Sequence, residues 1–359
     1  MDLTRYTRRY VSLTAAASGN QTFFTGEKKP MESVVFYRLS GKADCPFSLL
    51  FSDSIDSTFE DGSHSRAGEV LGGWKILSAH AAVVKAPKPG EPVEEARLTF
   101  EGKPEKAAAR GEWFASDPLN LRGAAGEYLR LRLVFTGKRL PCLRETLLDS
   151  YRRQGESWVV SPETPLAAMI GAEKPARVRL GFLGDSITEG IGTEPGSYQG
   201  YVSLLSSLLG EEYAVWNLGL GYARAEDAAG NGSFLRKAKA CDAVVICLGT
   251  NDLLQTGDAE KLRENLKKII SLLREAGVRI LLQTLPPFDY EGELEQKWKE
   301  TNGFLKEELG KELPVFDPVP LLSPDGGNTG RALYGGHPNA EGCRKWAQAL
   351  SGELIKWLA

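Results

Sequence analysis

Residues 178–189 read VRLGFLGDSITE, a short apolar run that ends in Gly-Asp-Ser. A run of this length and composition predicts a buried strand over 178–183 that delivers Ser186 to its carboxyl end. In an open sheet of parallel strands, ligands bind at that edge. We therefore expect Ser186 to lie where chemistry is done.

The second half of the chain alternates between strand and helix patterns. Apolar runs typical of buried strands lie at 178–183, 214–218, 243–248, 278–285 and 315–316. Helical stretches follow them near 197–209, 225–239, 258–275, 293–309 and 339–358. Strict alternation of this kind predicts an α/β domain with a parallel sheet covered by helices on both faces.

The first half of the chain has a different pattern, with short β-branched or aromatic runs separated by Gly, Pro, Asp and Ser clusters. Many short strands without a long helical period predict an antiparallel, jelly-roll-like β-sandwich. Residues 161–176 are rich in proline and small residues, which favours a linker. The predicted organisation is a sandwich over 1–160, a linker over 161–176 and an α/β domain over 177–359.

Composition and charge exclude several classes of protein. The 359 residues are 42% hydrophobic and 25% charged, and the net charge is −3. A chain with this charge lacks the basic field that holds nucleic acid or an acidic membrane surface. No run approaches the roughly 20 apolar residues of a membrane span, and the N-terminal stretch is too short and polar for a signal-peptide core. Scattered cysteines favour the cytoplasm, or secretion if a signal was removed.

Four short motifs stand at or just after the ends of predicted strands. They are GDSIT at 184–188, NLGLG at 217–221, GTND at 249–252 and GGHPNAEG at 335–342. Because the loops that follow parallel strands converge on one rim of the sheet, these separate motifs can meet.

The motifs contain the parts of a serine nucleophile site. A serine needs a base to remove its proton, and the chain has three histidines. His80 lies in an alternating strand and His64 in a polar turn, so His337, the sole histidine of the second half, is the predicted base for Ser186. Such a base contributes about 10²- to 10⁴-fold in rate.

Acyl transfer also needs hydrogen-bond donors for the oxyanion that develops on the substrate. The backbone amides of the Ser186 turn and of Gly221, with the side-chain amide of Asn251, would supply three. A glycine suits such a position because its amide can approach the substrate with no Cβ in the way.

In this order, GDSIT, a glycine turn, GTND and HPN resemble the four blocks of the SGNH, or GDSL, hydrolases. The resemblance covers about residues 177–359 and implies a three-layer α/β/α fold shared by esterases, lipases, thioesterases and carbohydrate deacetylases. It implies Ser186 as nucleophile and His337 as base, with the Ser186 amide, the glycine-turn amide and Asn251 forming the oxyanion hole. A sandwich ahead of such a domain resembles carbohydrate esterase family two.

The residue that orients the histidine departs from the family pattern. The family usually has an Asp three residues before the His, and this chain has Tyr334 there. Either Asp325, in the loop SPDGGNTG, reaches the imidazole of His337, or the site is a Ser-His dyad whose ring is oriented by a backbone carbonyl.

The glycine turn departs as well. The family's oxyanion glycine commonly stands five residues after the Asn, where this chain has Tyr222. Gly221 fits the role if the loop is one residue shorter, and Gly219 is the other candidate.

Simpler interpretations compete at several positions. Ser186 could be a helix N-cap with Glu189 at the third helical position, and we interpret Asp185 and Asp252 as structural. Aromatic and basic residues on loops of the catalytic side are candidates for substrate binding: Tyr198, Tyr222, Trp298, Arg331 and Tyr334. The dinucleotide glycine pattern breaks at Arg224, and three scattered histidines without a CxxC pair predict neither cofactor nor metal.

The sequence therefore predicts a carboxylic ester hydrolase of the acetylesterase type. Its expected substrate is a small-molecule or oligosaccharide ester, deacylated through an acyl-enzyme on Ser186. A lysophospholipase or thioesterase of the same superfamily is the second hypothesis. A catalytically inactive carbohydrate-binding protein is the third hypothesis, and it is suggested by Tyr334 at the position of the family's Asp.

Overall fold

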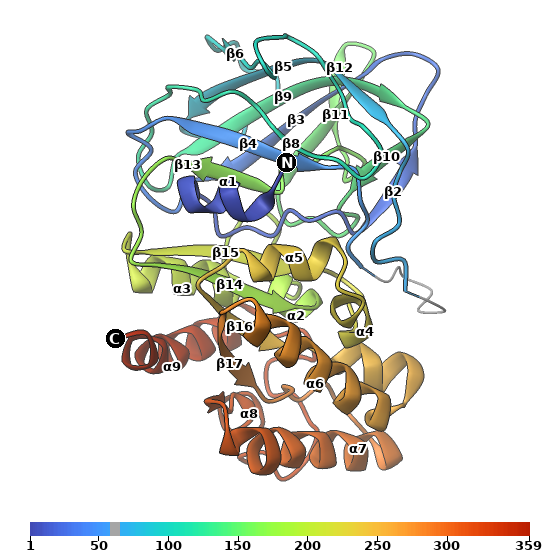
Figure 1. Ribbon diagram of the computed structural model, residues 1–359, viewed down its shortest axis with the longest axis vertical. Helices are drawn as coiled ribbons and strands as arrows, with labels where there is room; N and C mark the ends of the chain where they lie inside the picture. The colour runs from blue at the N-terminus through green and yellow to red at the C-terminus, as the bar shows by residue number, and fades with distance from the viewer. Residues whose placement is uncertain (58–64) are drawn as a thin grey trace.

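The computed structural model describes residues 1–57 and 65–359, and His64 lies outside the described residues. Figure 1 shows a half built of antiparallel strands packed against a half in which strands and helices alternate. The architecture changes after residue 172, where the last antiparallel strand ends, whereas the change of pattern was predicted near residue 160.

The first half is built from short strands and one helix, α1 (Leu3–Arg9). The strands are β1 (Val11–Ser12), β2 (Thr22–Thr25), β3 (Met31–Arg38), β4 (Phe47–Ser52), β5 (Trp74–Val84), β6 (Ala96–Arg97), β7 (Lys106–Ala107), β8 (Trp113–Ala115), β9 (Tyr128–Gly137), β10 (Arg139–Cys142), β11 (Asp149–Gln154), β12 (Ser157–Val160) and β13 (Met169–Ala172). They pair antiparallel in the orders β1-β13-β4-β8, β12-β11-β3-β9-β5-β6 and β10-β2, and β7 pairs with β5.

The two larger sheets pack face to face through aromatic side chains. The ring of Trp74 on β5 lies 6.3 Å from that of Phe51 on β4 and 5.8 Å from that of Phe114 on β8. All three side chains are buried. Rings at these separations contribute packing energy beyond the area they bury, and the predicted antiparallel sandwich is confirmed.

Strand β13 lies inside the segment predicted as a linker. Its four residues, Met169–Ala172, are all buried, and they pair with both β1 and β4. Small residues such as Gly171 and Ala172 carry little strand signal, which is why the sequence pattern missed this strand. The middle of 161–176 is thus part of the sandwich sheet, and the domain boundaries themselves stay a prediction.

The second half is built on a parallel sheet in the order β15-β14-β16-β17-β18. Its strands are β14 (Val178–Gly184), β15 (Tyr213–Gly219), β16 (Ala243–Cys247), β17 (Arg279–Gln283) and β18 (Val315–Phe316). The helical elements are α2 (Ser186–Glu189), α3 (Tyr201–Leu209), α4 (Ala225–Ala229), α5 (Ser233–Lys239), η1 (Asp252–Thr256), α6 (Ala259–Glu275), α7 (Gly292–Gly303), η2 (Phe304–Glu308), η3 (Leu309–Lys311), α8 (Val319–Leu322) and α9 (Ala340–Leu358).

Helices cover both faces of this sheet, because successive side chains of a strand point to opposite faces. On β16, Val244 and Ile246 belong to the apolar cluster that includes α5 and α6. Val245, between them, belongs to the cluster that includes α3 and α9. The predicted three-layer α/β/α arrangement is confirmed, and Figure 1 shows α9 and α6 on either side of the strands.

One predicted helix is broken in two. Residues 225–239 form α4 and α5, separated by Gly230, Asn231 and Gly232. Asn231 has a φ of 57°, in the left-handed region that a helix cannot contain. The apolar periodicity continues across the break, so the pattern alone predicted one helix.

The strand order creates the edge where the motifs meet. The chain passes from β14 to β15 on one side and then to β16 on the other. The helices that follow β14 and β16 pack on opposite faces of the sheet, so the chain leaves these two neighbouring strands in opposite directions. Such a switch point is the usual ligand site of an open parallel sheet.

A buried ion pair joins the two halves. Nζ of Lys237 on α5 lies 2.7 Å from Oδ2 of Asp56, and the side chains are only 2% and 1% exposed. Asp56 also accepts a hydrogen bond from the backbone N of Asn20 at 3.2 Å. Charges taken out of water are tolerated only when they are paired and hydrogen-bonded. A shift of one half against the other would break this pair, so the two halves must keep the relative position that preserves it.

The described residues include no helix that is both long and apolar enough to pass through a bilayer.

We expect Lys237→Met to destabilise the protein by about 3–5 kcal/mol, because the methionine leaves the Asp56 carboxylate buried and unpaired. The measurement is the urea unfolding midpoint by fluorescence and circular dichroism. The double variant Lys237→Met/Asp56→Asn removes the orphaned charge and should recover part of the loss.

The matched control is Lys356→Met, which breaks the exposed pair with Glu353, whose two side chains are 75% and 53% exposed. Exposed pairs contribute about 0–1 kcal/mol. If Lys237→Met and Lys356→Met shift the midpoint equally, the ion pair does not stabilise the interface.

Candidate active site

Ser186 is the first residue of α2, two residues after strand β14 ends at Gly184. The helix is capped by Asp185, whose Oδ1 accepts a hydrogen bond from the Ile187 amide at 3.0 Å. The competing interpretation of Ser186 as the N-cap is therefore wrong, since Asp185 is the N-cap of α2. The Ser186 hydroxyl is left for another partner, and its side chain stays at the edge of the sheet.

That partner is His337. Oγ of Ser186 lies 2.8 Å from Nε2 of His337, which stands in the loop before α9. Burial lowers the pKa of the His337 imidazole from its ordinary value of 6.5. The ring is then neutral at pH 7, which is the state in which Nε2 can accept the serine proton.

Aromatic packing holds the His337 ring. The ring of Phe288 stands edge-on to the imidazole, with centroids 5.0 Å apart and planes at 79°. Gly336 packs against the Phe288 ring. A Cβ at this position would lie 3.2 Å from three atoms of that ring. Within the described residues, nothing hydrogen-bonds Nδ1 of His337.

Neither Asp325, the predicted orienting residue, nor Tyr334, which stands at the family's Asp position, bonds to the imidazole. Asp325 binds its own loop, where its carboxylate accepts hydrogen bonds from the hydroxyl of Thr329 at 2.8 Å and the amide of Asn328 at 3.1 Å. The bond from Thr329 lowers the pKa of Asp325. Tyr334 points toward α9, where Lys345 hydrogen-bonds its hydroxyl. The prediction of Asp325 as the orienting residue thus has no support in these contacts.

The Gly221 amide is already engaged. Its N–H donates to Oε2 of Glu189 at 2.6 Å, so it does not serve as the oxyanion donor that we predicted. Glu189 is 5% exposed, and burial, reinforced by Glu145, raises its pKa well above the ordinary value. The next residue, Tyr222, has a φ of 62°, in the left-handed region where the family pattern has a glycine.

Asn251 lies where the motif placed it, between β16 and η1. One N–H of its side-chain amide donates to the carbonyl oxygen of Ala223 at 3.0 Å. This bond ties the GTND loop to the loop that follows β15. An amide nitrogen carries two hydrogens, so the second is available to a ligand.

The remaining substrate-binding candidates divide into two groups. Tyr198 and Trp298 are structural. The Tyr198 hydroxyl accepts from the Arg38 amide at 2.9 Å across the interface with the sandwich, and Trp298 is 1% exposed in the core. Both are aromatic residues near catalytic-side loops, which is why the sequence favoured them. Arg331 is exposed, and Tyr222 and Tyr334 are partly buried.

Two further carboxylates are buried beneath the site. Burial raises the pKa of Asp185 and of Asp252 to about 7 each. Asp185 caps α2, and Oδ2 of Asp252 accepts a hydrogen bond from the Ala225 amide at 3.0 Å. Their hydrogen bonds fix turns, in keeping with the structural role that we predicted for them.

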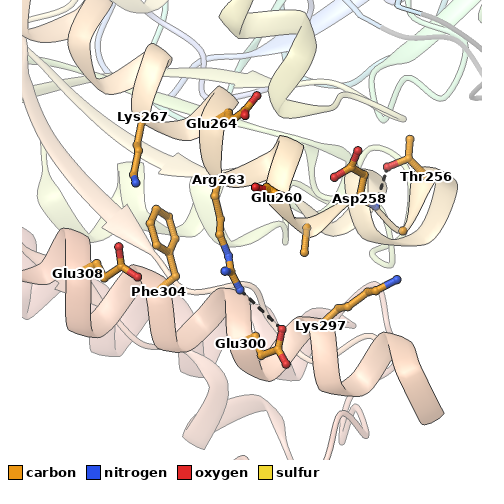
Figure 2. A pocket seen from close by; sticks show the side chains of 12 residues that line it. Thr256, Asp258, Glu260, Arg263, Glu264, Lys267, Lys297, Glu300, Phe304 and Glu308 are labelled. Carbon is orange, nitrogen blue, oxygen red and sulfur yellow. Dashed lines mark hydrogen bonds and ion pairs between the residues drawn. The ribbon is translucent and has the colours of Figure 1, made fainter.

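A separate groove of about 630 Å³ lies between α6 and α7. Figure 2 shows its charged lining, in which Arg263 lies 3.8 Å from Glu300. Neither Ser186 nor His337 is among the residues that line it. Charges of both signs face one another there, and they are most simply a solvated surface.

Residues 182–345 match the model of the GDSL-like Lipase/Acylhydrolase family. The match covers a little under half of the chain, and it confirms over that part the resemblance found in the four motifs. The acetylxylan esterase of Xylanibacter ruminicola is 27% identical over 217 residues, or 52% of this chain and 45% of that relative. The chain thus spans a little under half the length of this curated relative.

Two solved structures are also similar. A family two carbohydrate esterase from Cellvibrio japonicus is 12% identical, with 97% of this chain and 98% of that chain covered and a TM-score of 0.39. The psychrotrophic esterase EstA from Pseudoalteromonas sp. is 19% identical, with 50% of this chain and 98% of that chain covered and a TM-score of 0.39.

We expect the His337 imidazole to titrate below pH 6.5, because burial disfavours the imidazolium form. The neutral base then persists as the pH falls through 6.5. The measurement is a pH series of nitrogen-15 spectra of histidine-labelled protein, with His337→Gln to assign the signal. Asp325→Ala should leave the midpoint unchanged. A midpoint above 6.5 that falls in Asp325→Ala would show that this carboxylate does stabilise the imidazolium.

Proposed function

We propose that the chain is a serine carboxylic ester hydrolase that removes small acyl groups, acetyl above all, from oligosaccharides. The observation that carries the proposal is the 2.8 Å contact between Oγ of Ser186 and Nε2 of His337 at the carboxyl edge of the sheet. The acetylxylan esterase relative supports the choice of an acetylated carbohydrate.

The reaction proceeds through an acyl-enzyme. Oγ of Ser186 attacks the ester carbonyl carbon while its proton passes to Nε2 of His337. The tetrahedral intermediate collapses, and the imidazolium returns that proton to the departing sugar oxygen. Water then attacks the acyl-serine with the same histidine as base, and acetate leaves with Ser186 restored.

Three donors face the developing oxyanion in this mechanism. They are the backbone amides of Ser186 and Tyr222 and the side-chain amide of Asn251. Tyr222 takes the role first predicted for Gly221, because the Gly221 N–H is bonded to Glu189. Loss of one oxyanion donor commonly costs about 10²- to 10³-fold in kcat.

The histidine acts in this mechanism without a carboxylate partner, so Ser186 and His337 form a dyad. Packing against Phe288 takes over the orienting role. Burial keeps the imidazole neutral in the free enzyme, and a neutral ring is what the first proton transfer requires.

The preference for small acyl groups is supported by the segment between the second and third motifs. A long-chain esterase needs an apolar surface to receive the acyl chain. Between residues 221 and 251 the large apolar side chains, such as Phe234 and Leu235, are buried in the core at 0% exposure. This stretch therefore offers no apolar lid over Ser186.

Ser186→Ala should lower kcat for 4-nitrophenyl acetate by about 10⁶-fold, the usual cost of removing the nucleophile of a serine hydrolase. It should also abolish labelling by a fluorophosphonate probe. Ser207→Ala, on the surface of α3, is the matched control and should keep wild-type turnover. Turnover retained in Ser186→Ala would exclude Ser186 as the nucleophile. A wild-type protein that neither hydrolyses the ester nor reacts with the probe would favour the catalytically inactive carbohydrate-binding protein.

A series of 4-nitrophenyl esters tests the acyl preference. We expect kcat/KM to be highest for acetate and to fall as the acyl chain lengthens, because residues 221–251 offer no apolar lid to receive a long chain. Acetate release from acetylated xylo- and manno-oligosaccharides then identifies the sugar. An optimum above about eight carbons would favour a lysophospholipase or thioesterase instead, since each buried CH₂ contributes about 0.8 kcal/mol.

A further inference from the structure

The sandwich holds the turn that follows β15. Nε2 of Gln21 and Oγ of Ser57 both donate hydrogen bonds to the carbonyl oxygen of Gly221, at 3.2 Å and 3.0 Å. Gln21 and Ser57 come from the first half of the chain, and each is 0% exposed. A backbone carbonyl at the edge of the parallel sheet is thus bound by two buried side chains of the other half.

Gln21 is itself fixed at both ends of its amide. Its Oε1 accepts a hydrogen bond from the backbone N of Arg144 at 2.9 Å, and its Nε2 lies 3.4 Å from Oε2 of Glu145. Gly221 is a glycine because of these neighbours. A Cβ at this position would lie 2.2 Å from Oε2 of Glu145 and 2.5 Å from Nε2 of Gln21, so the sandwich side chains occupy the space of a side chain.

The other side of Gly221 is held from within the α/β half. Its N–H donates to Glu189 on α2 at 2.6 Å, so the peptides before and after Gly221 are both fixed. The Gly221–Tyr222 peptide is trans, and in a trans peptide the C=O and N–H point in opposite directions. Because the Gly221 carbonyl points at the sandwich, the Tyr222 N–H points away from it.

We propose that Gln21 and Ser57 are positioning residues that the sandwich supplies to the oxyanion loop. They hold the Gly221–Tyr222 peptide in the orientation that presents the Tyr222 amide to the oxyanion. The catalytic centre is then completed across the interface between the two halves. This inference rests on the proposed ester hydrolysis, and it assigns the sandwich a role in the chemical step.

The hydrogen bonds to the Gly221 carbonyl would set the direction of the Tyr222 N–H, which contacts the oxyanion only in the transition state. Their loss should therefore lower kcat. A donor misplaced by about 1 Å can cost about 10²-fold in rate. An interaction made only in the transition state lowers kcat and kcat/KM together and leaves KM near its original value.

The test compares steady-state kinetics on 4-nitrophenyl acetate for wild type, Gln21→Met and Ser57→Ala. Gln21→Met keeps the length of the side chain and removes both polar atoms. We expect kcat to fall by about 10- to 100-fold in Gln21→Met, with KM changed by less than about threefold. Ser57→Ala should show a smaller fall of the same kind, and Ser57→Thr, which keeps the hydroxyl, should recover turnover.

The matched control is Thr7→Val. It removes another buried hydrogen bond between the halves, from Oγ1 of Thr7 to the carbonyl oxygen of Ala240 at 3.0 Å, without touching the Gly221 turn. It should lose as much thermal stability as Ser57→Ala and keep wild-type kcat. If Gln21→Met fails to fold, the comparison of Ser57→Ala, Ser57→Thr and Thr7→Val still tests the positioning role.

The outcomes separate the two proposals. A wild-type protein without turnover dependent on Ser186 overturns the proposed hydrolysis. If that turnover is present but Gln21→Met and Ser57→Ala fold and keep wild-type kcat, only the positioning role is overturned. The same result follows if Thr7→Val loses kcat as they do, because the effect would then belong to the interface in general.

Discussion

Oγ of Ser186 and Nε2 of His337 lie 2.8 Å apart although 151 residues separate them in the chain. Their meeting depends on the parallel sheet. Strand β14 ends two residues before Ser186, and α9 begins three residues after His337. Each loop is then fixed by a local device, the Asp185 cap on one side and the Phe288 ring on the other. The sheet sets which loops meet, and these contacts set the direction of the side chains.

The interface between the halves is polar where it approaches this edge. Buried hydrogen bonds to Gly221 and the buried pair of Lys237 with Asp56 both cross it. Such groups contribute little net stability compared with an apolar contact of the same size, but they are costly when mispaired. We expect these polar contacts to favour one relative placement of the halves. That placement is what a loop shared between them requires.

Much of this could be predicted from the sequence, because apolar periodicity records the faces that are buried. The strands of the parallel sheet, the sandwich and the approach of Ser186 to His337 all follow from pattern and motif order. The direction of the Gly221 amide could not be predicted, since it is decided by Glu189 and by sandwich residues some 200 positions away. Trp298 shows the same limit, because an aromatic residue looks alike in sequence whether it lines a pocket or, at 1% exposure, the core.

On the proposed mechanism, the absence of a carboxylate bonded to His337 among the described residues has an energetic consequence. In a triad the carboxylate orients the imidazole and also stabilises the imidazolium that forms during attack. Packing against Phe288 replaces the first effect. Nothing in these contacts replaces the second, because burial lowers the pKa of His337 and so disfavours the charged ring. More of the transition-state stabilisation must then come from the oxyanion donors. The peptide held by Gln21 and Ser57 therefore carries more of the catalytic effect than it would in a triad.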